Sequence, residues 1–153
     1  MLISKNGVWF HEGTPIRRPA MVKLFASILK LENDSDYFLV TPAEKVGIKV
    51  EDLPFLITEM EVSGVGADQL IEFTTSTDER FEVNLDHPVA LSTASADGQP
   101  HPTAHVRSGL TGLISRAVYY RLVELAIERE TKANGKTEIQ LGVWSAGQFF
   151  ALG

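Results

Sequence analysis

Two arginines stand where helices are expected to begin, and their position suits anion binding. Arg18 opens one expected helix and Arg116 opens another. A guanidinium at this end opposes the helix macrodipole, whereas unpaired backbone N–H groups there attract phosphate or carboxylate. Arg18 and Arg116 are therefore predicted to contact an anionic ligand, with Arg17 and Arg107 as helpers. The alternative is that each arginine pairs with a structural carboxylate and stabilises helix docking.

The histidines and serines carry weaker signals. His101 and His105 would lie about 13 Å apart along one strand, too far to share a metal ion, and His87 with Asp86 adds no ligand-spacing motif. No metal site is therefore expected. The serines fall outside any Gly-x-Ser-x-Gly elbow, and glycine motifs for phosphates or dinucleotides are missing from the sequence. An enzyme using His87 or His105 is the third hypothesis for function; no catalytic residue and no cofactor is predicted.

A sequence repeat places the two arginines in related surroundings. Residues 16–25 resemble residues 114–123, and the run from Gly7 to Trp9 is echoed by the run from Gly142 to Trp144. This self-similarity predicts one supersecondary unit used twice, with the ligand at the seam between the copies.

The first part of the chain, residues 1–52, is predicted to be a β-α-β-β unit. Strands are expected at 8–10, 37–40 and 46–50. A helix with Pro19 near its first position is expected to end before Asn33. Its buried stripe is predicted from spacings of three and four residues and consists of Met21, Leu24, Phe25 and Ile28.

The second part, residues 53–153, is predicted to be an antiparallel sheet with a capping helix and a closing hairpin. A period of two indicates a β-meander with strands at 55–62, 69–75, 80–85, 89–93 and 103–110, and a turn at Asp97-Gly98. Ser115 is the expected N-cap of a helix whose packed face comprises Val118, Tyr119, Leu122, Val123, Leu125 and Ala126. The polar stretch 128–137 is expected to fray and turn at Asn134-Gly135. A hairpin of 139–144 and 148–152 then closes the chain.

The predicted fold class is therefore α+β, with duplicated strand, helix and strand units around an antiparallel meander. Its C-terminal part is a curled sheet capped by a helix, by analogy with pleckstrin-homology-like architectures.

Composition limits the partners and the compartment. The chain has 153 residues, a formal net charge of -6 and no cysteine. An acidic chain disfavours broad nucleic-acid binding, and without cysteine there is no disulfide or thiolate chemistry. Apolar runs stay shorter than the roughly 20 residues that cross a bilayer, and no signal peptide is recognised, so the expected location is the cytoplasm.

Taken together, short motifs resemble a known family. They lie at residues 7–16, 37–45, 50–55, 87–88, 106–110, 116–120 and 142–150. In this order they are similar to the bacterial domain of unknown function family 1285. The resemblance implies no established enzymatic activity, a duplicated fold, and a seam that holds a nucleotide-like ligand in signalling. Carried onto this sequence, the seam positions implied by the family motifs are Thr41, Glu44, Lys45, Arg107, Arg116 and Trp144.

The leading functional hypothesis is a small-ligand-binding or sensory module that binds an anionic, nucleotide-like molecule between the repeats. The alternative is a protein-interaction module without a small-molecule ligand, because the sheet must end in edges that can receive a partner.

Overall fold

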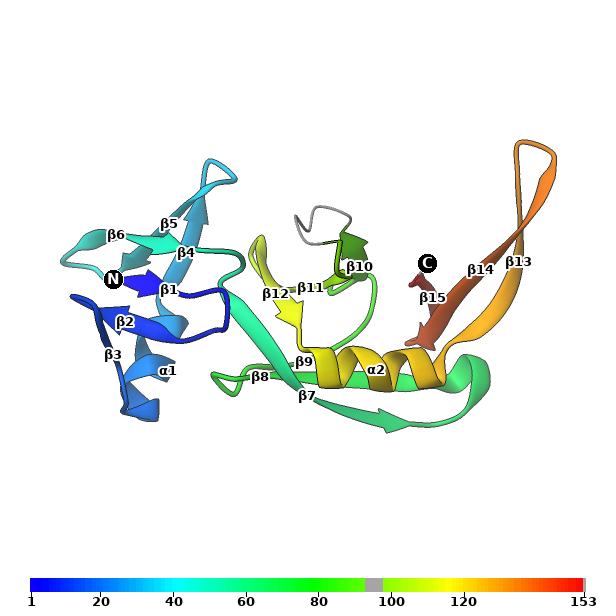
Figure 1. Cartoon of the computed structure of the whole chain (residues 1–153), viewed down its shortest axis with the longest axis horizontal. Helices are drawn as coiled ribbons and strands as arrows, with labels where there is room; N and C mark the ends of the chain where they lie inside the picture. The colour runs from blue at the N-terminus through cyan, green and yellow to red at the C-terminus, as the bar shows by residue number, and fades with distance from the viewer. Residues whose placement is uncertain (93–97, 153) are drawn as a thin grey trace.

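The computed structural model describes residues 1–92 and 98–152, and the strands of this part of the chain form three sheets (Figure 1). The predicted strand end at Thr93 and the predicted turn residue Asp97 lie outside the described residues. Within the described residues, no helix has the length and apolar character needed to cross a membrane.

The first sheet is built from residues 2–50. Its strands are β1 (Leu2–Ile3), β2 (Trp9–His11), β3 (Thr14–Pro15), β4 (Leu29–Glu32), β5 (Asp36–Val40) and β6 (Lys45–Val50). They lie in the order β3-β2-β1-β6-β5-β4. Each group of three consecutive strands is an antiparallel meander, and the parallel pair β1 and β6 joins the two meanders.

The second sheet repeats this topology. Its strands are β7 (Phe55–Ser63), β8 (Leu70–Thr75), β9 (Arg80–Glu82), β10 (Val89–Ser92), β11 (His101–Arg107) and β12 (Leu110–Ile114), and the short helix η1 (Gly66–Asp68) follows β7. The order β9-β8-β7-β12-β11-β10 matches the first sheet strand for strand, with β7 and β12 parallel. The predicted duplication and α+β class are therefore confirmed. The sheet differs from a purely antiparallel meander at the β7–β12 pair.

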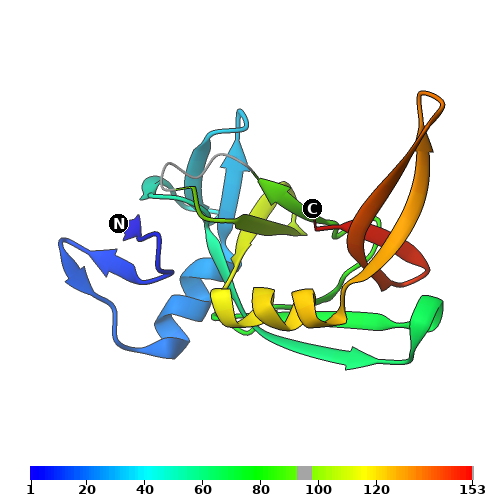
Figure 2. The same cartoon turned by 45° about the vertical axis from the view of Figure 1, so that its right-hand side comes forward.

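The two helices occupy different places in the two halves. Helix α1 (Pro19–Ser27) connects β3 to β4, whereas α2 (Arg116–Leu125) follows β12 and lies along the open side of the curled second sheet (Figure 2). The repeat in the sequence around the two helix starts is therefore not the repeat of the fold. What the fold duplicates is a pair of three-stranded meanders.

Helix α1 is shorter than predicted, and only part of its predicted stripe, Phe25 and Ile28, packs against the core. The helix ends at Ser27 because Leu29 and Leu31 alternate with polar residues and form β4, so the prediction of a helix to residue 32 is wrong. Met21 and Leu24 are 39% and 62% exposed, which overturns their place in the buried stripe.

The buried face of α1 is centred on Ala26, with Val22, Phe25 and Ile28 packed around it. Phe25 stacks on Trp9 of β2, with ring centroids 6.4 Å apart. The sequence spacing fits both this face and the predicted one, and the contact with Trp9 decides between them.

Helix α2 follows its prediction more closely. Ser115 is the N-cap, and its hydroxyl accepts a hydrogen bond from the Val118 N–H at 3.3 Å. Val118 and Leu122 are buried as expected, but Val123 is 40% exposed, because the apolar face of the helix is broader than the surface that covers it.

Two local irregularities explain errors in the strand predictions. A bulge between Ile57 and Glu59 shifts the register of β7, so that Ile57 and Met60 both face the core. The predicted single strand 103–110 is two strands, β11 and β12, because Ser108 and Gly109 turn the chain with φ of 47° and 79°. Left-handed backbone at consecutive residues is typical of a tight hairpin turn.

The third sheet consists of β13 (Ile127–Ala133), β14 (Lys136–Ser145) and β15 (Gln148–Ala151). The polar stretch predicted to fray is therefore a regular strand, paired with β14 along its whole length. The β13–β14 hairpin projects from the body of the molecule in both views (Figures 1 and 2).

The base of the third sheet is fixed by the fully buried Ser145. Its hydroxyl donates to the Val83 carbonyl at 2.7 Å and accepts from the Ile71 N–H at 3.0 Å. A buried hydroxyl with both roles satisfied ties the second and third sheets together.

Candidate functional site

A groove with a volume of about 950 Å³ lies between the two halves of the chain. The first half contributes Lys5, Asn6, Glu51 and Asp52. The second half contributes the start of α2, the end of β12 and the start of β11, among them Arg116, Tyr119, Tyr120 and His101. The volume falls within the range of small-molecule sites, and a site at the junction of two units is a common location for a ligand.

Arg116 supplies an available positive charge in this groove. It is the first residue of α2, and within the described residues it makes no ion pair or side-chain hydrogen bond. The first turn of α2 contains no acidic residue. The first N–H groups of a helix have no partner within it, and Ser115 caps only that of Val118. Within the part of the chain that the structure describes, the start of α2 therefore combines a guanidinium without a partner with unpaired N–H groups.

Tyr119 and Tyr120 flank this positive end. They lie three and four residues after Arg116, and positions with this spacing share a side of a helix with the first residue. Tyr120 is 59% exposed, so its ring is accessible for stacking on a planar group.

The acidic side of the groove is occupied by internal contacts. His101 Nε2 lies 2.8 Å from Asp52 Oδ2, which links β11 to the segment that joins the halves. Glu51 Oε1 accepts the backbone N–H of Lys5 at 3.1 Å.

Burial, and secondarily the Asp52 carboxylate, raise the pKa of the Tyr37 hydroxyl above its usual value.

Arg18 is placed outside this groove. It is the N-cap residue of α1, is exposed, and has no ion-pair partner among the described residues. The two predicted anion-binding arginines are therefore both without a structural carboxylate in the described chain, but they do not line one groove.

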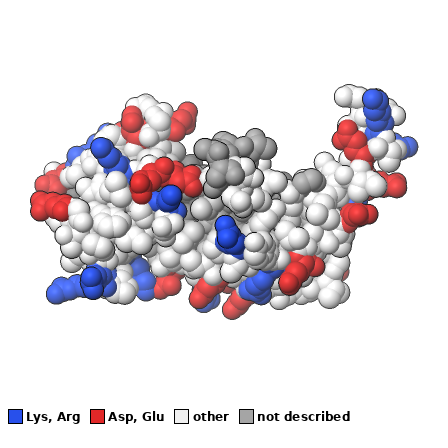
Figure 3. All heavy atoms as spheres, in the orientation of Figure 1, with Lys and Arg blue, Asp and Glu red and all other residues white. Residues whose placement is uncertain are grey.

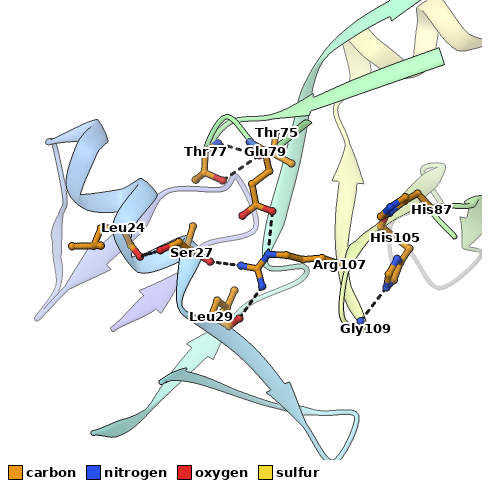
Figure 4. Close-up of polar contacts among 11 residues, drawn as sticks. Leu24, Ser27, Leu29, Thr75, Thr77, Glu79, His87, His105, Arg107 and Gly109 are labelled. Carbon is orange, nitrogen blue, oxygen red and sulfur yellow. Dashed lines mark hydrogen bonds and ion pairs between the residues drawn. The ribbon is translucent and has the colours of Figure 1, made fainter. Parts of the chain in front are cut away.

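The Arg107 guanidinium is held by hydrogen bonds to other parts of the chain (Figure 4). Its Nε donates to Glu79 Oε2 at 3.2 Å, Nη1 donates to the Leu29 carbonyl at 3.2 Å, and Nη2 donates to the Ala26 carbonyl. The guanidinium also lies 5.6 Å from the ring centre of Phe55. A cation at the carboxyl end of a helix is stabilised by the helix dipole. Here Arg107 of the second half donates a hydrogen bond to a carbonyl group in the last turn of α1, in the first half.

Thr41, Glu44 and Lys45 form and follow the turn between β5 and β6. The Thr41 N–H donates to the Glu44 carbonyl at 2.9 Å, and Thr41 Oγ1 accepts the Glu44 N–H at 3.1 Å. Lys45 pairs with Glu32 and lies 4.4 Å from the ring centre of Phe38. These contacts account for the turn, and none of the three residues lines the groove.

Trp144 lies in the third sheet, outside the groove. Its ring meets Phe149 edge to face at 5.6 Å, and the Arg129 guanidinium lies 5.4 Å from its ring centre. Of the seven predicted site residues, the structure therefore places one, Arg116, in the groove.

The histidines form separate groups. The rings of His87 and His105 stack at 5.6 Å, and His105 Nε2 accepts the Gly109 N–H at 3.0 Å. In the described part of the chain, neither ring contacts a serine hydroxyl, and no three His, Asp or Glu side chains are grouped to hold a metal ion.

Sequence reasoning missed the groove residues other than Arg116. Tyr119 and Tyr120 were detectable, since their spacing from Arg116 places them beside it. Lys5, Asp52 and His101 carried no local motif, because only the packing of the two halves brings them together.

Comparison with known proteins identifies close relatives of the whole chain. A family model described as the DUF1285 N-terminal domain matches residues 1–53, and one described as the DUF1285 C-terminal domain matches residues 54–152. A search of curated proteins finds no match.

Two solved structures are similar to this chain. A DUF1285 family protein from Silicibacter pomeroyi DSS-3 is 44% identical, with a TM-score of 0.87 over 99% of this chain and 78% of that chain. A DUF1285 family protein from Shewanella baltica OS155 is 33% identical, with a TM-score of 0.65 over 80% of this chain and 89% of that chain.

Proposed function

The chain belongs to the DUF1285 family, and we propose that it binds an anionic, nucleotide-like small molecule in the groove between its two halves. Binding of such a molecule suits a sensory module, whose output depends on whether the ligand is present. The observation that carries the proposal is the Arg116 guanidinium at the start of α2, which lies in a groove of ligand size and has no ion-pair partner among the described residues.

The chemistry of the groove favours a nucleotide over a simple anion. Phosphate suits Arg116 and the neighbouring N–H groups, because a guanidinium and a helix start both stabilise negative charge. The exposed ring of Tyr120 suits a base. In the same groove, the Glu51 and Asp52 carboxylates already contact the Lys5 N–H and His101 Nε2, and their remaining lone pairs suit ribose hydroxyl donors, because an ionised carboxylate only accepts hydrogen bonds.

The proposal is tested by thermal unfolding against a panel of mononucleotides and cyclic dinucleotides, with inorganic phosphate as a separate probe. A ligand that binds only the folded chain at about 100 times its Kd stabilises it by about 2.7 kcal/mol, which raises the unfolding midpoint by roughly 5 to 10 °C. Arg116→Gln is expected to abolish this rise for every phosphate-bearing ligand.

The chain offers a matched control. Arg18→Gln removes the other unpaired arginine at a helix start, outside the groove, and is expected to leave the rise intact. Absence of a rise with any nucleotide at millimolar concentration, or an equal loss in both variants, would refute the proposed function.

A further inference from the structure

Strand β13 is a long, free sheet edge. It has seven residues, of which all but Thr131 are exposed. Among the described residues, the other edge strands are β3, β4, β9, β10 and β15, and they have two, four, three, four and four residues. Folded proteins keep sheet edges short or covered, because a row of unpaired N–H and C=O groups is a template for another strand.

The third sheet is also the one meander of the described chain that has no partner meander. Each six-stranded sheet joins two three-stranded meanders edge to edge. Sheet β13-β14-β15 has three strands only, and its β15 edge lies beside β10, which leaves β13 open. A second copy of the chain would supply the missing meander.

The hairpin turn determines which backbone groups of β13 are free. Asn134 and Gly135 form a two-residue turn with φ of 53° and 75°, closed by the pair Ala133 and Lys136. In such a hairpin the closing pair exchanges both hydrogen bonds, and every second residue does the same. Arg129 and Thr131 therefore direct their backbone groups toward β14.

The free N–H and C=O groups of β13 belong to Glu128, Glu130 and Lys132. The hydrogen bonds of β14 support this assignment. The Leu141 carbonyl accepts the Leu152 N–H, which lies on the side of β14 away from β13. Leu141 is the cross-strand partner of Glu128, so both direct their backbone groups away from each other.

Charge selects one register for pairing between two copies. In an antiparallel self-pair, hydrogen-bonded pairs must form between the outward residues Glu128, Glu130 and Lys132. If Glu130 faced itself, Glu128 would lie opposite Lys132 of the partner subunit, but two glutamates would also be opposite each other at the centre. If Thr131 faces itself, Glu130 lies opposite Lys132 of the partner subunit and Lys132 lies opposite Glu130 of the partner subunit. Opposite charges and paired threonines at directly facing positions stabilise a sheet.

We propose that two copies of this chain associate through antiparallel pairing of their β13 strands, centred on Thr131. The two third sheets then form one continuous six-stranded sheet with a two-fold axis at its middle. The projecting hairpin carries charges of both signs and stands clear of the body, so the approach of a second copy is unobstructed (Figure 3).

The first measurement is sedimentation of the full chain over a range of concentrations. An interface of this small size is expected to give a dissociation constant in the micromolar range, on the order of 1 to 100 μM. Glu130→Lys alone and Lys132→Glu alone each place like charges opposite one another twice, and each is expected to weaken association by roughly 10- to 100-fold.

The proposed register makes a charge-exchange prediction. When the Glu130→Lys and Lys132→Glu variants are mixed, both facing pairs become Lys with Glu, so a heterodimer is expected to form. The double variant Glu130→Lys/Lys132→Glu restores the same pairs within a homodimer. These exposed substitutions are expected to leave the urea midpoint of the monomer unchanged.

A second readout is concentration-dependent exchange of backbone amides. Protection of the Glu130 and Lys132 amides is expected to increase with concentration, whereas those of Arg129 and Thr131 are already bonded to β14 and serve as the internal control. A monomer at all concentrations up to about 1 mM, or a dimer that neither single variant weakens or that the mixture does not restore, would overturn the proposal.

Discussion

Arg107 bonds the second half to two carbonyls of the first, and its removal is predicted to destabilise the whole chain. The guanidinium makes three hydrogen bonds, to the Glu79 carboxylate and to the carbonyls of Ala26 and Leu29. In Arg107→Met the apolar contact with Phe55 is largely kept, but all three hydrogen bonds are lost.

The magnitude follows from the number and burial of these bonds. A hydrogen bond to a charged group contributes about 1.5 to 3 kcal/mol when it is buried. The side chains of Arg107 and Glu79 are 32% and 25% exposed, so water replaces part of the lost bonding. We therefore expect Arg107→Met to lower the free energy of unfolding by about 2 to 4 kcal/mol, well below the sum of three buried bonds.

The assay is urea unfolding at neutral pH, followed by circular dichroism. Arg107→Lys keeps the charge but cannot reach three acceptors in a fixed plane, so it is expected to recover only about half of the loss. Arg18→Met, at an exposed and unpaired arginine, is the matched control and is expected to unfold like the original chain. The reasoning is refuted if Arg107→Met lies within about 0.5 kcal/mol of the original chain, or if Arg107→Lys is fully stable.

Three further predictions concern stability. A Cβ at Gly142 would lie 2.3 Å from the Phe150 backbone oxygen, so Gly142→Ala should lower the urea midpoint strongly. Gly47→Ala is the control, because a Cβ there would have its nearest contact at 3.7 Å, and its midpoint should not change. Similar midpoints for the two variants would contradict this prediction. Ser145→Ala leaves a buried backbone N–H without its acceptor and should cost about 1 to 3 kcal/mol in urea unfolding, and a neutral effect would show that the hydroxyl does not join the sheets. Because the pKa of Tyr37 is raised in the folded chain, its contribution to stability is complete below pH about 10 and is lost as the pH rises through the folded-state value. Tyr37→Phe should therefore lose less stability than the original chain between neutral pH and pH about 11, and parallel pH profiles would exclude this contribution.

The sequence was informative where one local pattern had one interpretation. The Ser115 cap and the buried residues Val118 and Leu122 were predictable, because a capping residue followed by apolar positions of helical period has few alternatives. The α+β class and the duplication were predictable for a similar reason, since alternation of apolar residues recurs through most of the chain.

Errors arose where tertiary contacts chose between equivalent patterns. The face of α1 was partly misassigned. Phe25 was placed correctly, but Met21 and Leu24 fit the helical spacing as well as Val22 does, and the contact of Phe25 with Trp9 leaves the first two exposed. The β7 bulge was invisible for a related reason. A register shift changes which alternate residues face the core without changing the composition of the strand.

The candidate site was less predictable than the fold. The helix macrodipole argument identified Arg18 and Arg116 equally, because both begin a helix. Only the packing of the halves places Arg116 in the same groove as Asp52 and leaves Arg18 outside it. Arg107 was predicted to contact the ligand, but it makes three structural hydrogen bonds instead. Its three acceptors are distant in sequence, so no local motif indicates them.

The Arg107 contact also has a consequence for the order in which the chain folds on the ribosome. Arg107 follows its acceptor Ala26 by 81 positions. At about 5 to 20 residues per second, roughly 4 to 16 s pass between the synthesis of Ala26 and the synthesis of Arg107. Throughout that interval, water must solvate the Ala26 and Leu29 carbonyls, so the amino-terminal segment reaches its final stability only after β11, which ends at Arg107, has been synthesised.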